Sequence, residues 1–476
     1  MLLDTIRQQC RQQAEALALQ EKDRCISYAQ LWQYTESIAT TLQVQGVAPG
    51  QPVIIYLERG IDAVLAALGV LLAGGCYVPL DIKNPPQRLA FIIDDAQAAA
   101  VIGIGEPPPW LKQPVWLDLS NCLATQPAMK HVEDTSLAAI LYTSGSTGQP
   151  RGVALSHKAI AAFTDWASQL VDLKPADRIA NSTPLFFDLS TFDLYAVLGR
   201  GASLHFVPAN LTMAPARLSR WLDDTAITGW YTVPSMLTFL VYKGRLSESN
   251  LRRLRFLFFA GEVFPTPALM ELVDNLPQTA LYNLFGPTET NVCCYWQVDR
   301  AELQVDKNIP IGQAAAGCEL TIQADTGALQ VRGTTLASGY WNKGQLQPFL
   351  NPEGWYETGD YVSLANDQFL FHGRLGRMLK CSGYRVEPAE IEAVVCSMPG
   401  IRECAVVGIP DATAGQRPAL AVCPAEINMS DIRQSLLQML PIYMQPIKYL
   451  RLDTLPRLAN GKLDYQALKA LFNLTT

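Results

Sequence analysis

Short apolar runs alternate with longer helix-like stretches over the first 374 residues of the chain. The apolar runs are rich in β-branched and aromatic residues and predict strands within residues 52–58, 98–104, 201–208 and 254–262. The longer stretches predict helices within residues 59–74, 156–171 and 214–224. This alternation is typical of parallel sheets covered by helices. We therefore expect a large N-terminal α/β domain of helix-covered sheets.

The pattern changes after residues 371–386. Helix-like stretches at 388–400 and 431–440 now accompany strand-like runs at 403–410 and 418–425. They predict a small α+β domain of about 100 residues, a size that folds alone. We place the boundary so that residues 1–375 form the large domain and residues 376–476 form a small, mobile C-terminal domain.

Composition narrows the classes of function. The chain has 476 residues and a formal net charge of -7, which argues against a nucleic-acid partner. The longest apolar stretch begins at Ala63 and is shorter than the roughly 20 residues that cross a bilayer, so we expect a buried helix and no membrane association. The first 20 residues lack the cationic-then-apolar order of a signal peptide.

Cysteine and histidine give no sign of a metal or disulfide framework. The eleven cysteines lack C-x-x-C spacing, and Cys293 and Cys294 are adjacent, so a reducing cytoplasm is expected. The histidines share no metal-ligand spacing and are interpreted as structural or surface residues: His131, His157, His205 and His372.

The stretch "LYTSGSTGQPRGVALSH", residues 141–157, lies between an apolar strand and a helix start. Glycine lets a backbone approach a ligand closely, and hydroxyls with free amides bind phosphate oxygens, especially before a helix. A flexible linker is the alternative, although linkers rarely lie between a strand and a helix. The Walker pattern is absent. We expect a polyphosphate ligand.

This loop resembles the phosphate-loop signature of the adenylate-forming superfamily, which includes acyl-CoA synthetases, luciferases and the adenylation domains of nonribosomal peptide synthetases. Further motifs follow in the family's order: "NLFGPTE" (283–289), "YETGD" (356–360), "GRLGRMLKCSGYRVEPAEIE" (373–392), "LPIYMQP" (440–446) and "LPRLANGKLD" (455–464). With "ISYAQLW" (26–32), they cover nearly the whole chain.

The resemblance implies that a carboxylate attacks the α-phosphate of ATP, expels pyrophosphate and leaves an acyl-adenylate. Lys462 matches the lysine that bridges the carboxylate and the phosphate, and Thr288 matches a hydroxyl donor to the α-phosphate. Glu289 matches the Mg²⁺ ligand, for which a hard oxygen donor is suitable. Alternatively, Lys462 is a solvated turn residue, and "PTET" is only a helix cap.

The resemblance also assigns the rest of the nucleotide site. Phe285 matches the aromatic residue that stacks on adenine, beside Gly286, and Asn283 is an amide able to read the base edge. Asp360 matches the acceptor of both ribose hydroxyls, and Arg374 helps to hold the sugar. Phe285 as core and Asp360 as a turn former are the alternatives. The phosphate-loop residues are Thr143, Ser144, Gly145, Ser146, Thr147, Gly148 and Arg151.

Two positions depart from the family pattern. Arg151 replaces the usual lysine, which keeps the positive charge but changes its geometry. Gly376 stands where the family commonly has Asp or Lys at the hinge between the domains, and glycine absorbs large changes in φ and ψ. The resemblance implies a rotating small domain that delivers Lys462 in one pose and residues 380–384 in the other.

Asp188 aligns with the aspartate that pairs with the α-ammonium group in peptide-synthetase adenylation domains, although it could instead cap a helix. The other predicted pocket residues carry no formal charge, which disfavours charged substrates: Leu189, Phe192, Tyr231, Phe258, Ala260, Leu284, Val292 and Cys293. Three aromatic rings favour a compact apolar amino acid. The set resembles those of proline-activating domains; leucine or another small apolar amino acid is the nearest rival.

No carrier-domain or condensation motif is found in the chain. We therefore expect a stand-alone adenylation enzyme that loads the phosphopantetheine thiol of a separate carrier protein, and it most resembles the prolyl-carrier-protein synthetases of anatoxin-type pathways. A piece excised from a larger synthetase is the alternative. An acyl- or aryl-CoA ligase would not depend on Asp188, and a non-catalytic scaffold would not need to retain Lys462 and Glu289.

Overall fold

The computed structural model describes residues 2–112, 114–122, 127, 132–145, 148–248, 251–305, 307–411, 414–458 and 463–474. These residues form two compact units. Unit 1 comprises residues 1–82, 93–142 and 152–373, and unit 2 comprises residues 83–92, 143–151 and 374–476. The predicted domain boundary after residue 375 stays a prediction.

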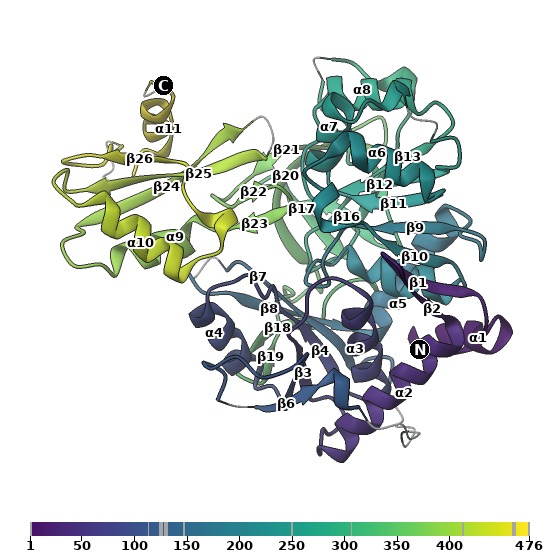
Figure 1. The fold of residues 1–476 in the computed structure, drawn as a ribbon. Coiled ribbons are helices and arrows are strands. Elements are labelled where there is room, and N and C mark those ends of the chain that lie inside the picture. The colour runs from purple at the N-terminus through teal and green to yellow at the C-terminus, as the bar shows by residue number, and fades with distance from the viewer. Residues whose placement is uncertain are drawn as a thin grey trace. The chain divides into compact units, whose positions relative to one another are not determined.

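The largest sheet of unit 1 has nine strands in the order β15-β14-β13-β12-β11-β9-β10-β1-β2 (Figure 1). Every adjacent pair from β13 to β1 is parallel, whereas the pairs β15–β14, β14–β13 and β1–β2 are antiparallel. The bounds are β1 Leu17–Glu21, β2 Arg24–Ser27, β9 Arg178–Asn181, β10 Ser203–Phe206, β11 Gly229–Thr232, β12 Phe256–Ala260, β13 Ala280–Phe285, β14 Cys294–Gln297 and β15 Gln313–Ala314.

Alternation along β12 explains how both faces of this sheet are buried. Leu257 and Phe259 belong to one hydrophobic core, and Phe256 and Phe258 belong to another, because successive side chains of a strand point to opposite faces. The first core also holds leucines from a row of three helices (Figure 1). These helices are α6 Pro215–Asp224, α7 Pro234–Lys243 and α8 Thr266–Asn275.

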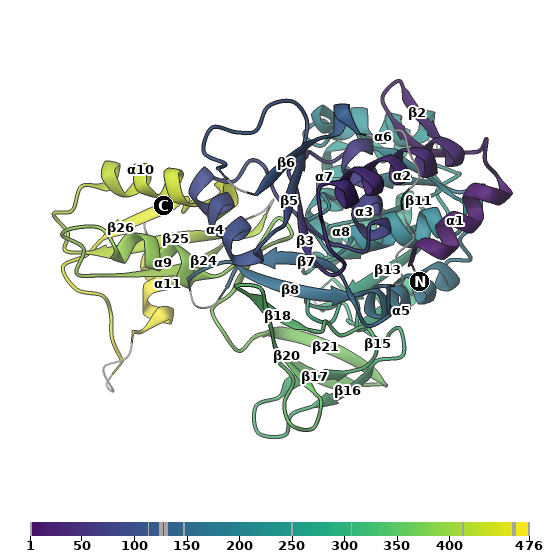
Figure 2. The same cartoon turned by 90° about the horizontal axis from the view of Figure 1, so that it is seen from below.

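The second sheet of unit 1 has eight strands in the order β19-β18-β8-β7-β4-β3-β5-β6. Beside it, α3 (Ile61–Leu72) is buried at every position except Asp62 and packs against α2 (Tyr28–Val44) (Figure 2). A helix that is apolar all round is a core helix, as the sequence predicted. The strands are β3 Pro52–Ile55, β4 Cys76–Pro79, β5 Ala100–Gly103, β6 Val115–Asp118, β7 Leu137–Thr143, β8 Arg151–Ser156, β18 Gly339–Asn342 and β19 Gln345–Gln347.

The sequence pattern did not predict the third sheet of unit 1. It has four strands in the order β16-β17-β20-β21 (Figure 2). Their bounds are β16 Glu319–Ile322, β17 Ala328–Arg332, β20 Tyr356–Ala365 and β21 Gln368–Arg374. The remaining elements before residue 374 are α1 Leu2–Gln12, α4 Pro86–Ala96, α5 His157–Leu170, η1 Leu119–Asn121, the π-helical η2 Phe192–Val197, η3 Ala209–Leu211, η4 Leu246–Glu248 and η5 Arg300–Glu302.

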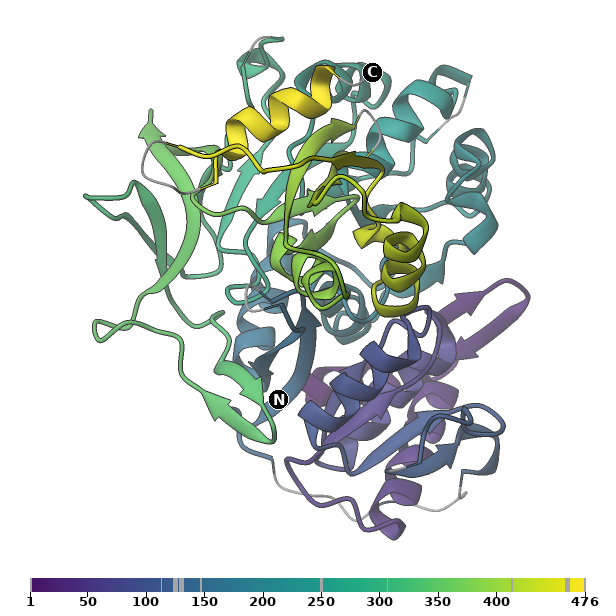
Figure 3. The ribbon, with the colours of Figure 1, turned by 90° about the vertical axis from the view of Figure 1, so that its left-hand side faces the viewer.

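Unit 2 contains a five-stranded sheet with helices on both faces (Figure 3). Apolar residues of α9 and α10 join a core on one face, and Leu468 and Phe472 of α11 join a core on the other. The elements are β22 Leu379–Cys381, β23 Tyr384–Val386, α9 Pro388–Cys396, β24 Glu403–Asp411, β25 Gly415–Cys423, α10 Met429–Met439, η6 Ile442–Met444, β26 Lys448–Arg451 and α11 Tyr465–Leu474.

The predicted fold class, α/β with a smaller α+β part, is confirmed by these elements. Every helix and strand named from the sequence pattern is present, shifted by a few residues at its ends. Among the helices of the described ranges, none combines the length and apolar character needed to cross a bilayer. The same ranges contain no group of three or more His, Cys, Asp or Glu residues arranged to hold a metal ion.

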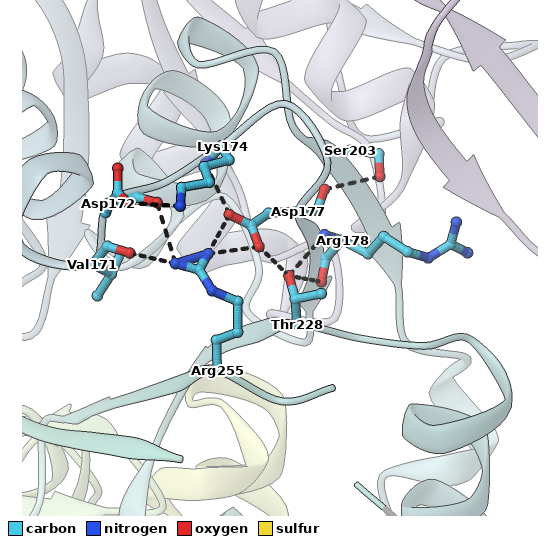
Figure 4. Close-up of polar contacts among 8 residues, drawn as sticks. All are labelled: Val171, Asp172, Lys174, Asp177, Arg178, Ser203, Thr228 and Arg255. Atoms are coloured by element: carbon cyan, nitrogen blue, oxygen red, sulfur yellow. Dashed lines mark hydrogen bonds and ion pairs between the residues drawn. The ribbon is translucent and has the colours of Figure 1, made fainter. Parts of the chain in front are cut away.

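An ion pair with one buried partner, Asp177, ties together segments at the N-terminal ends of three strands of the nine-stranded sheet (Figure 4). Arg255 donates through Nη1 to both carboxylate oxygens of Asp177, at 2.8 and 2.6 Å. The Thr228 hydroxyl donates to the same carboxylate at 2.7 Å, and the Lys174 amide does so at 2.8 Å. Asp177 is 3% exposed, so these partners must compensate for the hydration that its carboxylate loses on folding.

Replacing Asp177 by Asn is expected to lower the free energy of unfolding by about 2–3 kcal/mol, because Arg255 and Thr228 lose a charged acceptor. Urea unfolding of the purified protein measures the loss. Asp172→Asn is the matched control, since its ion pair with Lys174 is largely exposed and is expected to contribute less than about 1 kcal/mol. Equal losses in the two variants would contradict the prediction.

His205 on β10 is fully buried, and its Nε2 lies 2.8 Å from the Ser203 hydroxyl oxygen. Burial, helped by the charge of Arg178, lowers the pKa of His205 to about 3. The unfolded chain therefore binds more protons below pH ~6.5, so this residue makes stability fall as the pH drops from about 6.5 toward 3. The loss reaches about 2 kcal/mol at pH 5.

Replacing His205 by Gln is expected to remove this part of the pH dependence. Urea unfolding at pH 7 and pH 5 should give a smaller decrease in stability for the variant than for the wild type. His372→Gln, which removes an exposed imidazole, is the control. An unchanged slope in His205→Gln would count against the buried, neutral imidazole.

Candidate active site

Two carboxylic acids lie between β9 and the end of η2, Asp188 before η2 and Asp193 within it, and their surroundings differ. Asp193 is fully buried and accepts a hydrogen bond from Asn181 Nδ2 at 2.6 Å. Burial raises the pKa of Asp193 to about 8, against the opposing effects of Asn181 and Arg59. A side chain that is mostly protonated at neutral pH is a poor partner for an ammonium group. Asp188, and not Asp193, is therefore the candidate anion of this segment.

Asp188 lies in a tight turn just before η2. Its backbone carbonyl accepts from the Thr191 amide at 3.0 Å and from the Thr191 hydroxyl at 2.6 Å. Burial is the larger cause that raises the pKa of Tyr231 well above its ordinary value, and the charge of Asp188 adds to it. The Asp188 carboxylate therefore lies near enough to the predicted pocket residue Tyr231 to disfavour a second negative charge there.

Three of the predicted pocket residues form one aromatic cluster. The Phe192 ring lies 5.2 Å from that of Phe258 and 6.0 Å from that of Tyr231, measured between centroids, and the Tyr231 and Phe258 rings are 5.6 Å apart. All three pairs meet edge to face, the geometry that aromatic quadrupoles favour. The structure thus brings together Phe192 of η2, Tyr231 of β11 and Phe258 of β12.

The other predicted pocket residues are buried in three places: Leu189 in the turn before η2, Ala260 and Leu284 near the carboxyl ends of their strands, and Val292 and Cys293 in the loop before β14. Ala260 of β12 is paired with Leu284 of β13 in the sheet register. The Cys293 amide donates to the Phe285 carbonyl at 2.9 Å. The exposed fractions are Leu189 8%, Ala260 6%, Leu284 1%, Val292 3% and Cys293 0%. Carboxyl ends of parallel strands are where α/β sheets bind ligands.

The turn after β13 carries the two residues predicted to contact phosphate and Mg²⁺. Glu289 is 1% exposed, and its Oε1 accepts from the Tyr340 hydroxyl at 3.0 Å. Thr288 precedes it and is half-buried. A Cβ at Gly286 would lie 1.7 Å from the Asn291 carbonyl oxygen, so only glycine fits at this position.

The predicted adenosine residues have defined surroundings in unit 1. Asn283 Nδ2 donates to the Pro310 carbonyl at 2.7 Å, and the Phe285 ring lies 5.7 Å from that of Phe371. Asp360 on β20 is 1% exposed, and its amide donates to the Thr358 hydroxyl oxygen at 3.0 Å. The Asn283 amide, proposed to read the base edge, therefore already has one protein partner.

In unit 2, the first residues of the glycine-rich loop lie against the start of α9. The Gly145 amide donates to Glu390 Oε1 at 2.7 Å, and the Ser144 hydroxyl donates to the Arg385 carbonyl at 2.7 Å. Arg88 Nη1 contacts the other oxygen of Glu390 at 2.5 Å. Arg88 is 7% and Glu390 1% exposed as side chains. The loop amide therefore binds an anionic oxygen, here a carboxylate.

The remaining predicted residues of unit 2 are only partly described. Gly148 has a φ of +85°, and an added Cβ would lie 3.0 Å from the Ala393 side chain, so glycine suits both the backbone and the space. A Cβ at Gly376 meets nothing within 4 Å, so this conformation does not require glycine there. Thr143 ends β7, Arg151 begins β8 and Arg374 ends β21. Ser146, Thr147 and Lys462 lie outside the described residues.

Sequence reasoning missed several side chains that contact predicted site residues. Tyr340 contacts Glu289, Phe371 packs on Phe285, and Glu390 holds Gly145. Glu390 lies within the motif at 373–392, but nothing in that motif shows which amide it accepts from. Only the tertiary fold identifies these partners, because 51 residues separate Tyr340 from Glu289 and 245 separate Glu390 from Gly145.

The chain matches two families: AMP-binding enzyme over residues 6–341 and AMP-binding enzyme C-terminal domain over residues 390–462. It is 35% identical to an L-proline–[L-prolyl-carrier protein] ligase of Streptomyces coelicolor, over 93% of this chain and 91% of that protein. A protein of the same name from Pseudomonas fluorescens is 34% identical over 95% of both chains.

Among solved structures, the amide bond synthetase McbA of Marinactinospora thermotolerans has the same fold, with a TM-score of 0.87 at 21% identity over 98% of this chain and 99% of that one. The Asp188 turn, the aromatic cluster and the glycine-rich loop therefore belong to a fold that this chain shares with that protein. The family match spans most of the chain, and the chain belongs to the AMP-binding enzyme family.

Proposed function

We propose that this enzyme activates L-proline with ATP, releases pyrophosphate and transfers the prolyl group from AMP to the phosphopantetheine thiol of a separate carrier protein. The observation that carries the proposal is the Asp188 turn beside a buried, uncharged aromatic cluster. A zwitterionic amino acid needs an anion for its ammonium group and an apolar surface for its side chain. The two relatives named as L-prolyl-carrier protein ligases support the same activity.

The proposed choice of proline rests on size and charge. Phe192, Tyr231 and Phe258 are at most 2% exposed and pack on one another, which favours a compact apolar side chain. A charged side chain would lack a partner among the predicted pocket residues. Leucine stays the nearest rival, because one methylene changes affinity by only about 1–3 kcal/mol.

For the nucleotide, the Gly145 amide and the residues of the turn after β13 are the proposed contacts. An amide that donates to the carboxylate of Glu390 can also donate to a phosphate oxygen. Glu289 is the proposed protein ligand of Mg²⁺, a hard cation that usually keeps several waters and phosphate oxygens. The turn after β13 supplies one buried carboxylate, that of Glu289, and the described residues contain no group of three or more potential metal ligands. A single protein ligand suits a cation that is otherwise bound by water and phosphate. Bound Mg²⁺ would neutralise phosphate charge.

A cytoplasmic location belongs to the same proposal. All eleven cysteines are free thiols, which suits a reducing compartment. A soluble carrier protein bearing phosphopantetheine is then available as the acceptor of the prolyl group.

ATP–pyrophosphate exchange with a panel of acids tests the proposal. L-Proline is expected to give the highest kcat/KM, followed by L-leucine. Tetrahydrofuran-2-carboxylate, which replaces the ring nitrogen of proline by oxygen, should be activated poorly because it offers no ammonium group to Asp188. Exchange that is equally fast with this analogue would favour an acyl-CoA ligase.

The transfer step has its own test. Intact mass spectrometry should detect a prolyl adduct on phosphopantetheinylated L-prolyl carrier protein, with coenzyme A as the competing acceptor. Transfer to coenzyme A alone would overturn the carrier-loading part of the proposal and leave amino-acid activation standing.

A further inference from the structure

Asn291 follows the turn that carries Thr288 and Glu289 and has an uncommon backbone conformation. Its φ is +52°, in the left-handed region that asparagine tolerates better than most residues. The side chain is 4% exposed, and Oδ1 accepts from the Val292 amide at 2.9 Å. This local bond supports the conformation, because short polar side chains hydrogen-bond nearby backbone groups.

The other end of the Asn291 side chain reaches a distant segment of unit 1. Nδ2 donates to the Thr191 hydroxyl oxygen at 3.3 Å. That hydroxyl in turn donates to the Asp188 carbonyl oxygen at 2.6 Å. Thr191 is fully buried, so water cannot readily replace either bond. Asn291 is thus connected to the Asp188 turn through a single side chain.

The backbone of Asn291 closes the turn after β13. Its amide donates to the Thr288 carbonyl at 3.4 Å, and its carbonyl accepts from the Thr290 hydroxyl at 3.1 Å. The same carbonyl lies against Gly286, where a Cβ would clash. One residue therefore joins the turn proposed to contact phosphate and Mg²⁺ to the turn proposed to bind the amino group.

We propose that Asn291 is a positioning residue for the amino acid: through Thr191 it holds the Asp188 turn in the orientation that receives the ammonium group. The inference rests on the proposed function, since it requires Asp188 to bind the amine. Asn291 acts through Thr191 and is not proposed to contact the substrate. Its amide is needed as a donor, and a carboxylate of the same shape cannot replace it because the Thr191 oxygen would face a second acceptor.

Steady-state ATP–pyrophosphate exchange with L-proline tests the proposal in four variants of the full chain. Asn291→Gly keeps the left-handed backbone but removes both side-chain bonds, and Asn291→Asp keeps only the bond to Val292. Thr191→Val removes the hydroxyl, whereas Thr191→Ser retains it. The first three are expected to raise the KM for proline about 3- to 10-fold, with the KM for ATP changed less than about twofold.

Two comparisons separate positioning from general stability. Thr191→Ser should keep the KM for proline close to that of the wild type. The double variant of Asn291→Asp and Thr191→Val should have a KM for proline no higher than that of the more impaired single variant, because both substitutions remove the bond between Asn291 and Thr191. Asn366→Gly is the matched control: Asn366 also has a positive φ, +50°, but is exposed in the hairpin between β20 and β21.

Effects of the two substitutions that multiply in the double variant, or equal rises in both KM values, would overturn the inference. The Asp188→Ala variant, measured in parallel, distinguishes the two levels of failure. If Asp188→Ala leaves the KM for proline unchanged, the proposed role of Asp188 is wrong. If Asp188→Ala raises it but Asn291→Asp and Thr191→Val do not, only the role of Asn291 fails.

Discussion

Replacement of Lys462 by Ala is expected to reduce the rate of prolyl-adenylate formation at least about 100-fold, while the Kd for ATP changes less than about threefold. Negative charge gathers on the phosphate as the carboxylate attacks, and a cation matters most where that charge develops. The assignment of Lys462 rests on the "LPRLANGKLD" motif, because the residue lies outside the described part of the chain.

Pyrophosphate exchange measures the first quantity, and equilibrium binding of ATP measures the second. Lys469→Ala is the matched control, since it removes a lysine seven positions further along, within α11 and outside the motif. Exchange rates that are the same in Lys462→Ala and the wild type would refute the role of this residue as the catalytic cation.

Replacement of Asp188 by Ala is expected to raise the KM for proline about 10- to 100-fold and the KM for ATP less than about threefold. The ammonium group would lose its only proposed anionic partner, and a hydrogen bond to a charged group contributes about 1.5–3 kcal/mol. Asp188→Asn, which retains the shape of the side chain, should have a similar effect because the charge is lost.

Asp193→Asn is the matched control for this experiment. Asp193 has a pKa raised to about 8 by burial, so at pH 7 a neutral amide is close to its protonated form, and the hydrogen bond from Asn181 can be kept. Equal rises in the two KM values for Asp188→Ala, or a larger rise for Asp193→Asn, would count against Asp188 as the partner of the amine.

Much of the fold could be predicted from the sequence, because its signals are local. The apolar stretch that begins at Ala63 predicted a buried helix, and α3 is buried at every position but Asp62. The antiparallel strands β14 and β15 and the whole β16-β17-β20-β21 sheet had no such signal, since short strands of mixed polarity resemble loops.

The candidate site was predictable as a set of motifs but not as a set of contacts. The motif at 283–289 identified Gly286 and Glu289, yet the carbonyl of Asn291 against Gly286 and the hydroxyl of Tyr340 on Glu289 depend on how loops return to one another. The two aspartates of "FFDLSTFDLY" are similar in sequence, and only burial and hydrogen bonding distinguish Asp188 from Asp193.

The carboxylate of Glu390 on the Gly145 amide has a consequence for the thermodynamics of phosphate binding. This amide has already given up its hydration shell during folding, so an incoming phosphate oxygen replaces one anionic acceptor by another and need not strip water from the donor. The released carboxylate can keep Arg88 as its counterion, which limits the electrostatic penalty of the exchange.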